Sequence, residues 1–369
     1  MQQACGVIIA PRETEAPGTG AWQTLNQSWQ HRDGRICLNS TRFRSRSPIG
    51  RLPQPARNWR GRQLVLLLLI ASLIGVAGCR VLGPMPIDVQ SQHFSAALID
   101  ADQPQIEIGK PRPIIDRIGW VVGIPDKLLL WDRRIDRHKI SEETILATAC
   151  YLEDNHLPHV KVRANQYAPL KDWKRLTQNK TISWPTRYTF GAFSVAGEAI
   201  LPGRIFGGDH FNPFTQTVHL YSDIPAIALH EAAHAKDFSR REHQDLYAAA
   251  YLFLPIWHET IASEDVFAYL QDQGDREQIA EAHRILYPAY GTYVGSAVGG
   301  FGGSYALPVY FAGVTAGHIN GRMLARALPG PAVPAAIEHA MLTSGSNPAA
   351  DTAEIFPASF HSPAPDLHR

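Results

Sequence analysis

A five-residue motif, His230-Glu231-Ala232-Ala233-His234, constrains this chain more than any other feature of its sequence. It lies in an alanine-rich apolar stretch, 224–238, that predicts a mostly buried helix. Residues four positions apart share one face of a helix, so both imidazoles can reach a single zinc ion. Glu231 lies to the side of that face, where it can accept a proton from a metal-bound water. The motif therefore predicts zinc ligands at His230 and His234 and a general base at Glu231.

The residues before the motif predict a strand that leads into this helix. Residues 215–221 alternate in the manner of a strand, Ser222 and Asp223 are N-cap candidates, and Pro225 suits the first helical turn. A strand, a capped turn and a helix in this order are typical of a metallopeptidase. The alternative is a pair of histidines that only satisfy hydrogen bonds inside a buried helix.

A catalytic zinc ion needs a third protein ligand and an open position for water. Residues 257–265 predict the start of an acid-rich helix that carries Glu259, 25 residues after His234. Glu264 is the alternative ligand on the same helix. Asp237 shares the helical stripe of the two histidines one turn further along, which suits a hydrogen bond to a ligand. No glycine and histidine follow His234 at the spacing of the metzincins, which argues against that class.

On these residues the chain resembles the gluzincin class of zinc metallopeptidases. In that class the third ligand is a glutamate on a following helix, in a pattern such as E-x-x-A-D or E-x-x-x-D. Residues 259–263 match E-x-x-A, with Ser263 where the class usually has aspartate. The resemblance implies His230, His234 and Glu259 as ligands of Zn²⁺, Glu231 as general base, and Asp237 or Asp265 as the supporting acid. It also implies a zincin-like fold and a peptide or protein substrate.

A basic and then apolar segment upstream predicts an export signal. Residues 57–62 contain three arginines, residues 64–76 are apolar, and Val76-Ala77-Gly78-Cys79 resembles a bacterial lipobox. The apolar run is short for a transmembrane helix. Segment 57–79 therefore predicts a lipoprotein of the bacterial cell envelope, tethered to the membrane through lipidated Cys79 and facing the periplasm or the exterior. An uncleaved anchor or a buried helix is the alternative.

The rest of the chain divides into four parts. Residues 1–56 predict a disordered extension or a start site further along the chain, and residues 80–113 a proline-dotted tether. Residues 114–328 predict one α+β domain with a small sheet packed on the motif helix, followed by a mainly helical half. Residues 329–369 predict a flexible tail rich in proline and alanine.

Charge and cysteine content narrow the possible partners and modifications of the exported chain. Residues 1–78 hold ten arginines and three acids, so the remainder has 25 basic and 31 acidic residues and a formal charge of −6. That balance gives no indication of a nucleic-acid partner. Beyond the signal only Cys79 and Cys150 remain, so acylation of Cys79 leaves no intramolecular disulfide, and Cys150 is expected to be a buried helix residue.

Within the domain, residues 141–155 predict a helix that starts at Ser141, and residues 159–164 predict a strand. The glycine-rich loop 203–213 is interpreted as a turn cluster or, alternatively, as an edge that guides an extended peptide. Four histidines are expected to be surface or hydrogen-bonded groups and not ligands: His156, His159, His210 and His219.

Residues 285–321 contain no Asp, Glu, Lys or Arg and many glycines. Gly295, Gly299 and Gly303 have the four-residue spacing that lets helices approach closely. We expect a buried or cleft-lining segment, with contact of residues 285–320 to the membrane or a full span as alternatives. Candidate donors to a developing oxyanion are Tyr287, Tyr290, Tyr293 and His318.

The expected function is hydrolysis of peptide bonds by a zinc-activated water. Two alternatives remain at this point: a binding or scaffold lipoprotein that keeps the fold without turnover, and an amidase or other zinc hydrolase that acts on envelope material.

Overall fold

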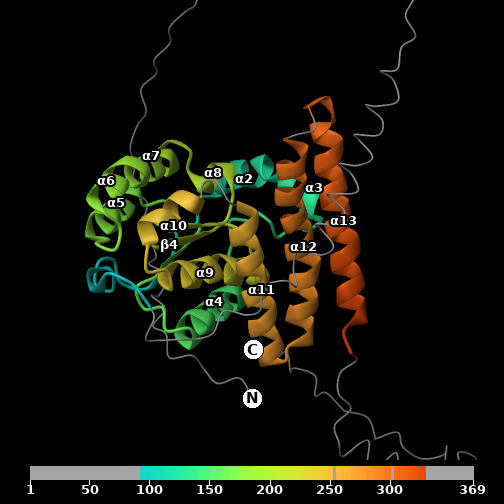
Figure 1. Cartoon of the computed structure of the whole chain (residues 1–369), viewed down its shortest axis with the longest axis horizontal. Helices are drawn as coiled ribbons and strands as arrows, with labels where there is room; N and C mark the ends of the chain where they lie inside the picture. Colours follow the sequence, from blue (N-terminus) through green and yellow to red (C-terminus); the bar gives the residue numbers. More distant parts are fainter. Residues whose placement is uncertain (1–91, 252–254, 301–302, 330–369) are drawn as a thin grey trace, which may run out of the picture. The chain divides into compact units, whose positions relative to one another are not determined.

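The computed structural model describes residues 92–251, 255–300 and 303–329. Up to Ala327 these residues form one unit, in which helices surround a four-stranded mixed sheet (Figure 1). The expected α+β class is therefore confirmed. The expected extension, the signal segment with Cys79, the first part of the tether and nearly all of the tail lie outside the described residues.

The sheet has the strand order β1-β2-β4-β3. Its strands are β1 (Ile106–Ile108), β2 (Lys161–Ala164), β3 (His210–Asn212) and β4 (Thr217–Leu220). β1, β2 and β4 run parallel, and β3 is antiparallel to β4. The strands expected at 159–164 and 215–221 are confirmed. β1 lies inside the expected tether 80–113, so the folded part begins before residue 114, because Ile106 is fully buried where it pairs with Val162.

The two faces of the sheet differ in character, because side chains alternate along each strand. One face carries a buried apolar row that includes Val162, Val218 and Phe211, and the ring of Phe211 lies 5.9 Å from that of Phe238 on the motif helix. The other face carries a polar row in register across all four strands: Glu107, Arg163, His219 and His210. The sheet thus separates the motif helix from a buried polar layer.

Short helices surround this part of the chain. They are η2 (Ala96–Leu98), α2 (Pro113–Val122), α3 (Ile124–Leu130), α5 (Pro169–Gln178), α6 (Trp184–Thr186), η3 (Arg187–Gly191), α7 (Ala192–Ile200) and α8 (Gly203–Phe206). Two of them, α5 and α7, carry side chains that bind the polar row. α5 supplies Asp172, whose carboxylate accepts a 2.7 Å hydrogen bond from the buried Arg163 of β2. α8 and β3 fall within loop 203–213, so that segment is more ordered than a turn cluster.

Helix α4 (Glu142–Asp154) begins and ends as the sequence predicts. Ser141 is its N-cap, with its hydroxyl accepting a 3.4 Å hydrogen bond from the Thr144 amide, and Asn155 is its C-cap. Cys150 on this helix is half-buried and forms a disulfide, so the expectation of a buried cysteine without a disulfide is wrong.

The motif helix is α9 (Pro225–Ser239), with Pro225 at its first position. The expected caps are wrong: Ile224 is the N-cap and makes no side-chain cap bond. Ser222 instead accepts a hydrogen bond from the Asp136 amide, and Asp223 accepts one from the Ser141 amide. These two polar side chains therefore hold neighbouring loops in place. The helix has less need of a side-chain cap, because the proline at its first position has no amide N–H that would require a partner.

All described elements after α9 are helical too. They are α10 (Gln244–Tyr251), α11 (Pro255–Gln273), α12 (Arg276–Gly299), η4 (Gly303–Tyr305) and α13 (Ala306–Ala327). α11 packs against both α9 and α12, and α12 lies along α13 (Figure 1). Among the described residues, no helix combines the length and apolar character that a membrane span requires.

Glycines allow α12 and α13 to pack with their backbones close together. A Cβ on Gly291 would lie 2.5 Å from the Gly313 carbonyl oxygen, and one on Gly295 would lie 2.7 Å from that of Tyr310. These antiparallel contacts confirm the close approach expected for Gly295 and Gly299. Gly303 belongs to η4, where a Cβ would meet nothing within 4 Å, so its part of that expectation is wrong.

Asp136 is a buried carboxyl group beside α8. Its Oδ1 accepts a 3.1 Å hydrogen bond from the Gly208 amide, whereas its Oδ2 has no hydrogen-bond partner. Burial, and then the charge of Asp209, raise the pKa of Asp136 from 3.8 to about 7, although the Gly208 bond and Lys127 oppose this shift. The folded state therefore prefers the protonated acid.

We expect the contribution of Asp136 to stability to fall as the pH rises from about 4 to about 7, because over that window the folded chain binds a proton at Asp136 that the unfolded chain has lost. Asp136→Asn should make the dependence of stability on pH less steep over this window and raise the free energy of unfolding above pH 7 by about 2 to 4 kcal/mol. Denaturant melts at a series of pH values measure it. Asp100→Asn on an exposed residue is the control, and an unchanged slope in Asp136→Asn would contradict the prediction.

Candidate metal centre

Helix α9 lies at the centre of the fold and is buried all round. Within it only Ile227 is not fully buried, which is typical of a helix with neighbours on every side. It contacts the sheet, α4, α11 and α12. The polar side chains of the motif therefore need partners inside the protein.

The structure brings together the three ligands expected from the sequence. Nε2 of His230 and Nε2 of His234 lie 3.1 Å apart, and their rings are nearly perpendicular. The Glu259 carboxylate on α11 reaches both, with Oε2 at 2.9 Å from His230 and Oε1 at 3.3 Å from His234. Ligands at about 2.0 to 2.1 Å from a tetrahedral zinc ion are separated by about 3.3 Å. The spacing and the His₂Glu donor set fit one zinc ion.

Charge stabilises this arrangement. Burial alone would raise the pKa of Glu259, but the charges of His234 and His230 outweigh it and hold that pKa well below the usual range. Burial lowers the pKa of His234, yet the Glu259 carboxylate reverses the shift and raises it. A buried cation between these groups would meet an ionised carboxylate and two imidazole nitrogens.

Glu231 is buried beside this group but is not one of its members. Burial raises the pKa of the Glu231 carboxyl. His234 and His230 oppose the shift, and the negative charges of Glu259 and Asp209 add to it. A carboxylate that is close to the cluster and more basic than usual has the properties of a general base.

The neighbours of the cluster come from α11 and α12. Oγ of Ser263 lies 3.4 Å from Nδ1 of His230, so the serine that replaces the expected aspartate contacts a ligand directly. The hydroxyl of Tyr293 on α12 hydrogen-bonds Glu259, and its pKa is raised by burial and by the charges of Glu259 and Glu231. Tyr293 keeps about a third of its surface exposed, so it lies between the cluster and solvent.

The other oxyanion candidates lie elsewhere. The hydroxyl of Tyr290 accepts a hydrogen bond from Thr260, and Tyr287 packs against Phe267. His318 lies 2.8 Å from the Leu129 carbonyl oxygen and stacks on a tryptophan. Of the four sequence candidates, Tyr293 is the one that forms a hydrogen bond with a member of the cluster, Glu259.

The acids expected to support the ligands hold helices together instead. Asp265 is bonded to Lys236 at 2.6 Å and to the hydroxyl of Tyr151. Asp237 accepts hydrogen bonds from Arg241 and Tyr247, and its charge raises the pKa of the His234 imidazole. Glu264, the alternative ligand, is buried on α11 but outside the group of three.

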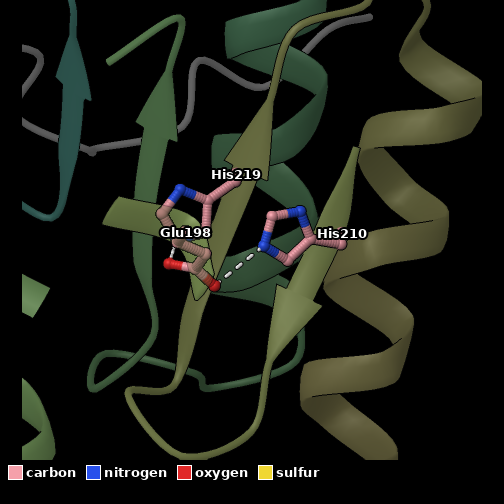
Figure 2. A group of neighbouring side chains, drawn as sticks. All are labelled: Glu198, His210 and His219. Atoms are coloured by element: carbon pink, nitrogen blue, oxygen red, sulfur yellow. Dashed lines mark hydrogen bonds and ion pairs between the residues drawn. The ribbon is translucent and has the colours of Figure 1, made fainter. Parts of the chain in front are cut away.

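A second group of possible metal ligands was not expected from the sequence. Glu198, His210 and His219 come together on the polar face of the sheet (Figure 2). His210 and His219 were expected to be surface or hydrogen-bonded groups and not ligands, and β3 and β4 pair them directly opposite each other. No sequence motif joins these three residues. The only sequence signal was the alternating pattern of residues 215–221, which predicted the strand that carries His219.

Comparison with protein-family models, with curated proteins and with solved structures finds no match for this chain.

Proposed function

We propose that this chain is a zinc-dependent metallopeptidase with a zincin-like, gluzincin-type site. The observation that carries the proposal is the convergence of His230, His234 and Glu259 on one point, with Glu231 beside them. We further propose a location in the bacterial cell envelope, although the disulfide of Cys150 argues against lipidation of Cys79 after cleavage, because no other cysteine would remain to pair with Cys150.

The proposed chemistry divides between the metal and the protein. Zinc bound by these three residues would polarise a carbonyl group and lower the pKa of water. Glu231 accepts the proton of that water and later delivers it to the leaving amine. The Tyr293 hydroxyl, freed from Glu259, donates a hydrogen bond to the oxygen on which negative charge develops.

The edge of the sheet offers a place for a peptide. Within the described residues β3 pairs only with β4, so we propose that an extended chain pairs with its outer edge. The charges of His210 and Glu231 interact, which indicates that β3 starts near the cluster. This supports the second interpretation of loop 203–213, as an edge that guides an extended peptide.

Removal of zinc tests the proposal. We expect the purified protein to cleave a fluorescence-quenched peptide library, to lose activity on chelation, and to regain it when zinc is restored. Glu259→Gln should lower zinc affinity by more than the roughly 10-fold to 100-fold that loss of a residue supporting a ligand costs, whereas Glu264→Gln on the same helix should leave it unchanged. Zinc binding without cleavage of any peptide would favour the scaffold alternative, and cleavage of envelope amides alone would favour the amidase.

A further inference from the structure

The second histidine and glutamate cluster lies on the face of the sheet opposite α9. Glu198 comes from α7, His210 from the edge strand β3 and His219 from β4 (Figure 2). The two imidazoles stack with 4.8 Å between ring centroids, and the Glu198 carboxylate reaches both. Because the apolar face meets α9 and the polar face meets α5 and α7, this cluster is distinct from that of His230 and His234.

The spacing of its atoms fits a transition-metal site. Oε1 of Glu198 lies 3.0 Å from Nε2 of His210, and Oε2 lies 3.5 Å from Nε2 of His219. Both separations are near the 3.3 Å or so expected between two ligands of a tetrahedral zinc ion. One ligand atom from each residue lies within 4.8 Å of the others.

Two buried atoms in this cluster lack hydrogen bonds. Nε2 of His219 and Oε2 of Glu198 face each other at 3.5 Å, and neither makes a hydrogen bond. A buried polar atom without a partner costs about 1 to 3 kcal/mol. A cation held between the nitrogen lone pair and the carboxylate would satisfy both atoms.

The surroundings orient the ligands as metal sites usually do. Nδ1 of His210 lies 3.0 Å from the Gly208 carbonyl oxygen, so this nitrogen is a donor and Nε2 is left to face Glu198. The Asn212 amide donates to Oε1 of Glu198 at 2.6 Å and to Ser194 at 2.9 Å. The carboxylate is thereby fixed relative to both strands.

A small cavity adjoins the cluster. It has a volume of about 10 Å³, room for a single water-sized particle, and its lining includes Glu198, His219, Asp172 and Tyr221. His210 is partly exposed, so an ion can enter from solvent on that side. The partly open side of the cluster, next to His210, leaves room for a water molecule as a further ligand.

We propose that Glu198, His210 and His219 bind a second divalent transition-metal ion of the zinc class. The imidazole pair and the single carboxylate match the borderline ligands that zinc prefers. The ion would join α7 to the β3–β4 hairpin and so stabilise the edge of the sheet. This site is independent of the proposed peptidase activity.

Zinc counting by mass spectrometry, on the full chain dialysed against zinc without chelator, tests the site. We expect about two zinc ions per chain in the wild type and about one in His210→Ala and in Glu198→Gln. His230→Ala should also hold about one, and His210→Ala/His230→Ala close to none. The exposed His243→Ala is the matched control and should hold about two.

Thermal melts give a second measurement that does not depend on activity. Zinc should raise the Tm of His230→Ala through the second site, and this rise should vanish in the double variant. Unchanged zinc content in both His210→Ala and Glu198→Gln would overturn the second site, leaving a metal-free ion pair. Loss of zinc in those variants but not in His230→Ala would support the second site and contradict the proposed function.

Discussion

Glu231→Gln is expected to lower kcat for peptide cleavage by about 10³-fold while zinc content stays at the wild-type level. Glutamine keeps the shape of the side chain but cannot accept a proton. Zinc should remain because Glu231 is outside the group formed by His230, His234 and Glu259. A 10³-fold loss corresponds to about 4 kcal/mol of transition-state stabilisation. Steady-state kinetics and metal analysis of the same preparation measure both quantities.

Glu242→Gln is the matched control, because Glu242 is an exposed acid just beyond the end of α9. It should leave both kcat and zinc content unchanged. A Glu231→Gln variant that retains activity would contradict a general base at this position. One that loses its zinc as well would show that Glu231 takes part in holding the metal.

The first metal cluster was predictable because most of it is encoded locally. Two ligands and the base lie within one turn of α9, so helical periodicity alone places them. The prediction of Glu259 as a ligand needed one further assumption, that the next long helix packs against α9. α11 does so. The substitution at Ser263 weakened that prediction, yet the serine hydroxyl contacts the imidazole of His230 as a supporting group would.

The second cluster depends on contacts that a sequence does not show. His210 and His219 meet because of the register of β3 on β4, and a slip of one residue would turn one imidazole to the opposite face. Glu198 joins them only because α7 packs over that face. The prediction of the α9 N-cap was wrong for a similar reason. Ser222 and Asp223 suit a helix start, but they accept hydrogen bonds from the backbone amides of Asp136 and Ser141 instead.

Gly295 and Gly299 gave a correct prediction of close packing without identifying the partner, whereas Gly303 takes no part in it. Between Gly291 and Gly295 on one helix and Gly313 on the other, backbone atoms take the place of side chains. Such a contact needs glycine on both helices at matching heights. The spacing within each helix is visible in the sequence, whereas the antiparallel alignment follows only from the turn between them.

Gly317→Ala is expected to lower the free energy of unfolding by about 3 kcal/mol, at the upper end of what overpacking usually costs. The new Cβ would lie 2.4 Å from the Tyr287 carbonyl oxygen and 2.6 Å from Cα of Pro288. Both are backbone atoms, so no side-chain rotation relieves the clash and the helices must separate. For a unit of this size the Tm should fall by about 6 to 12 °C. Calorimetry or denaturant melts measure the change.

Gly197→Ala in α7 provides the opposite expectation. A Cβ there meets nothing within 4 Å, so alanine should raise stability by about 0.5 to 1 kcal/mol through its better helix propensity.

Equal stability of Gly317→Ala and wild type would show that α12 and α13 do not pack this closely. Because α12 also carries Tyr293, which contacts Glu259, separation of these helices should reduce peptide cleavage by the zinc-loaded variant even at temperatures where it stays folded.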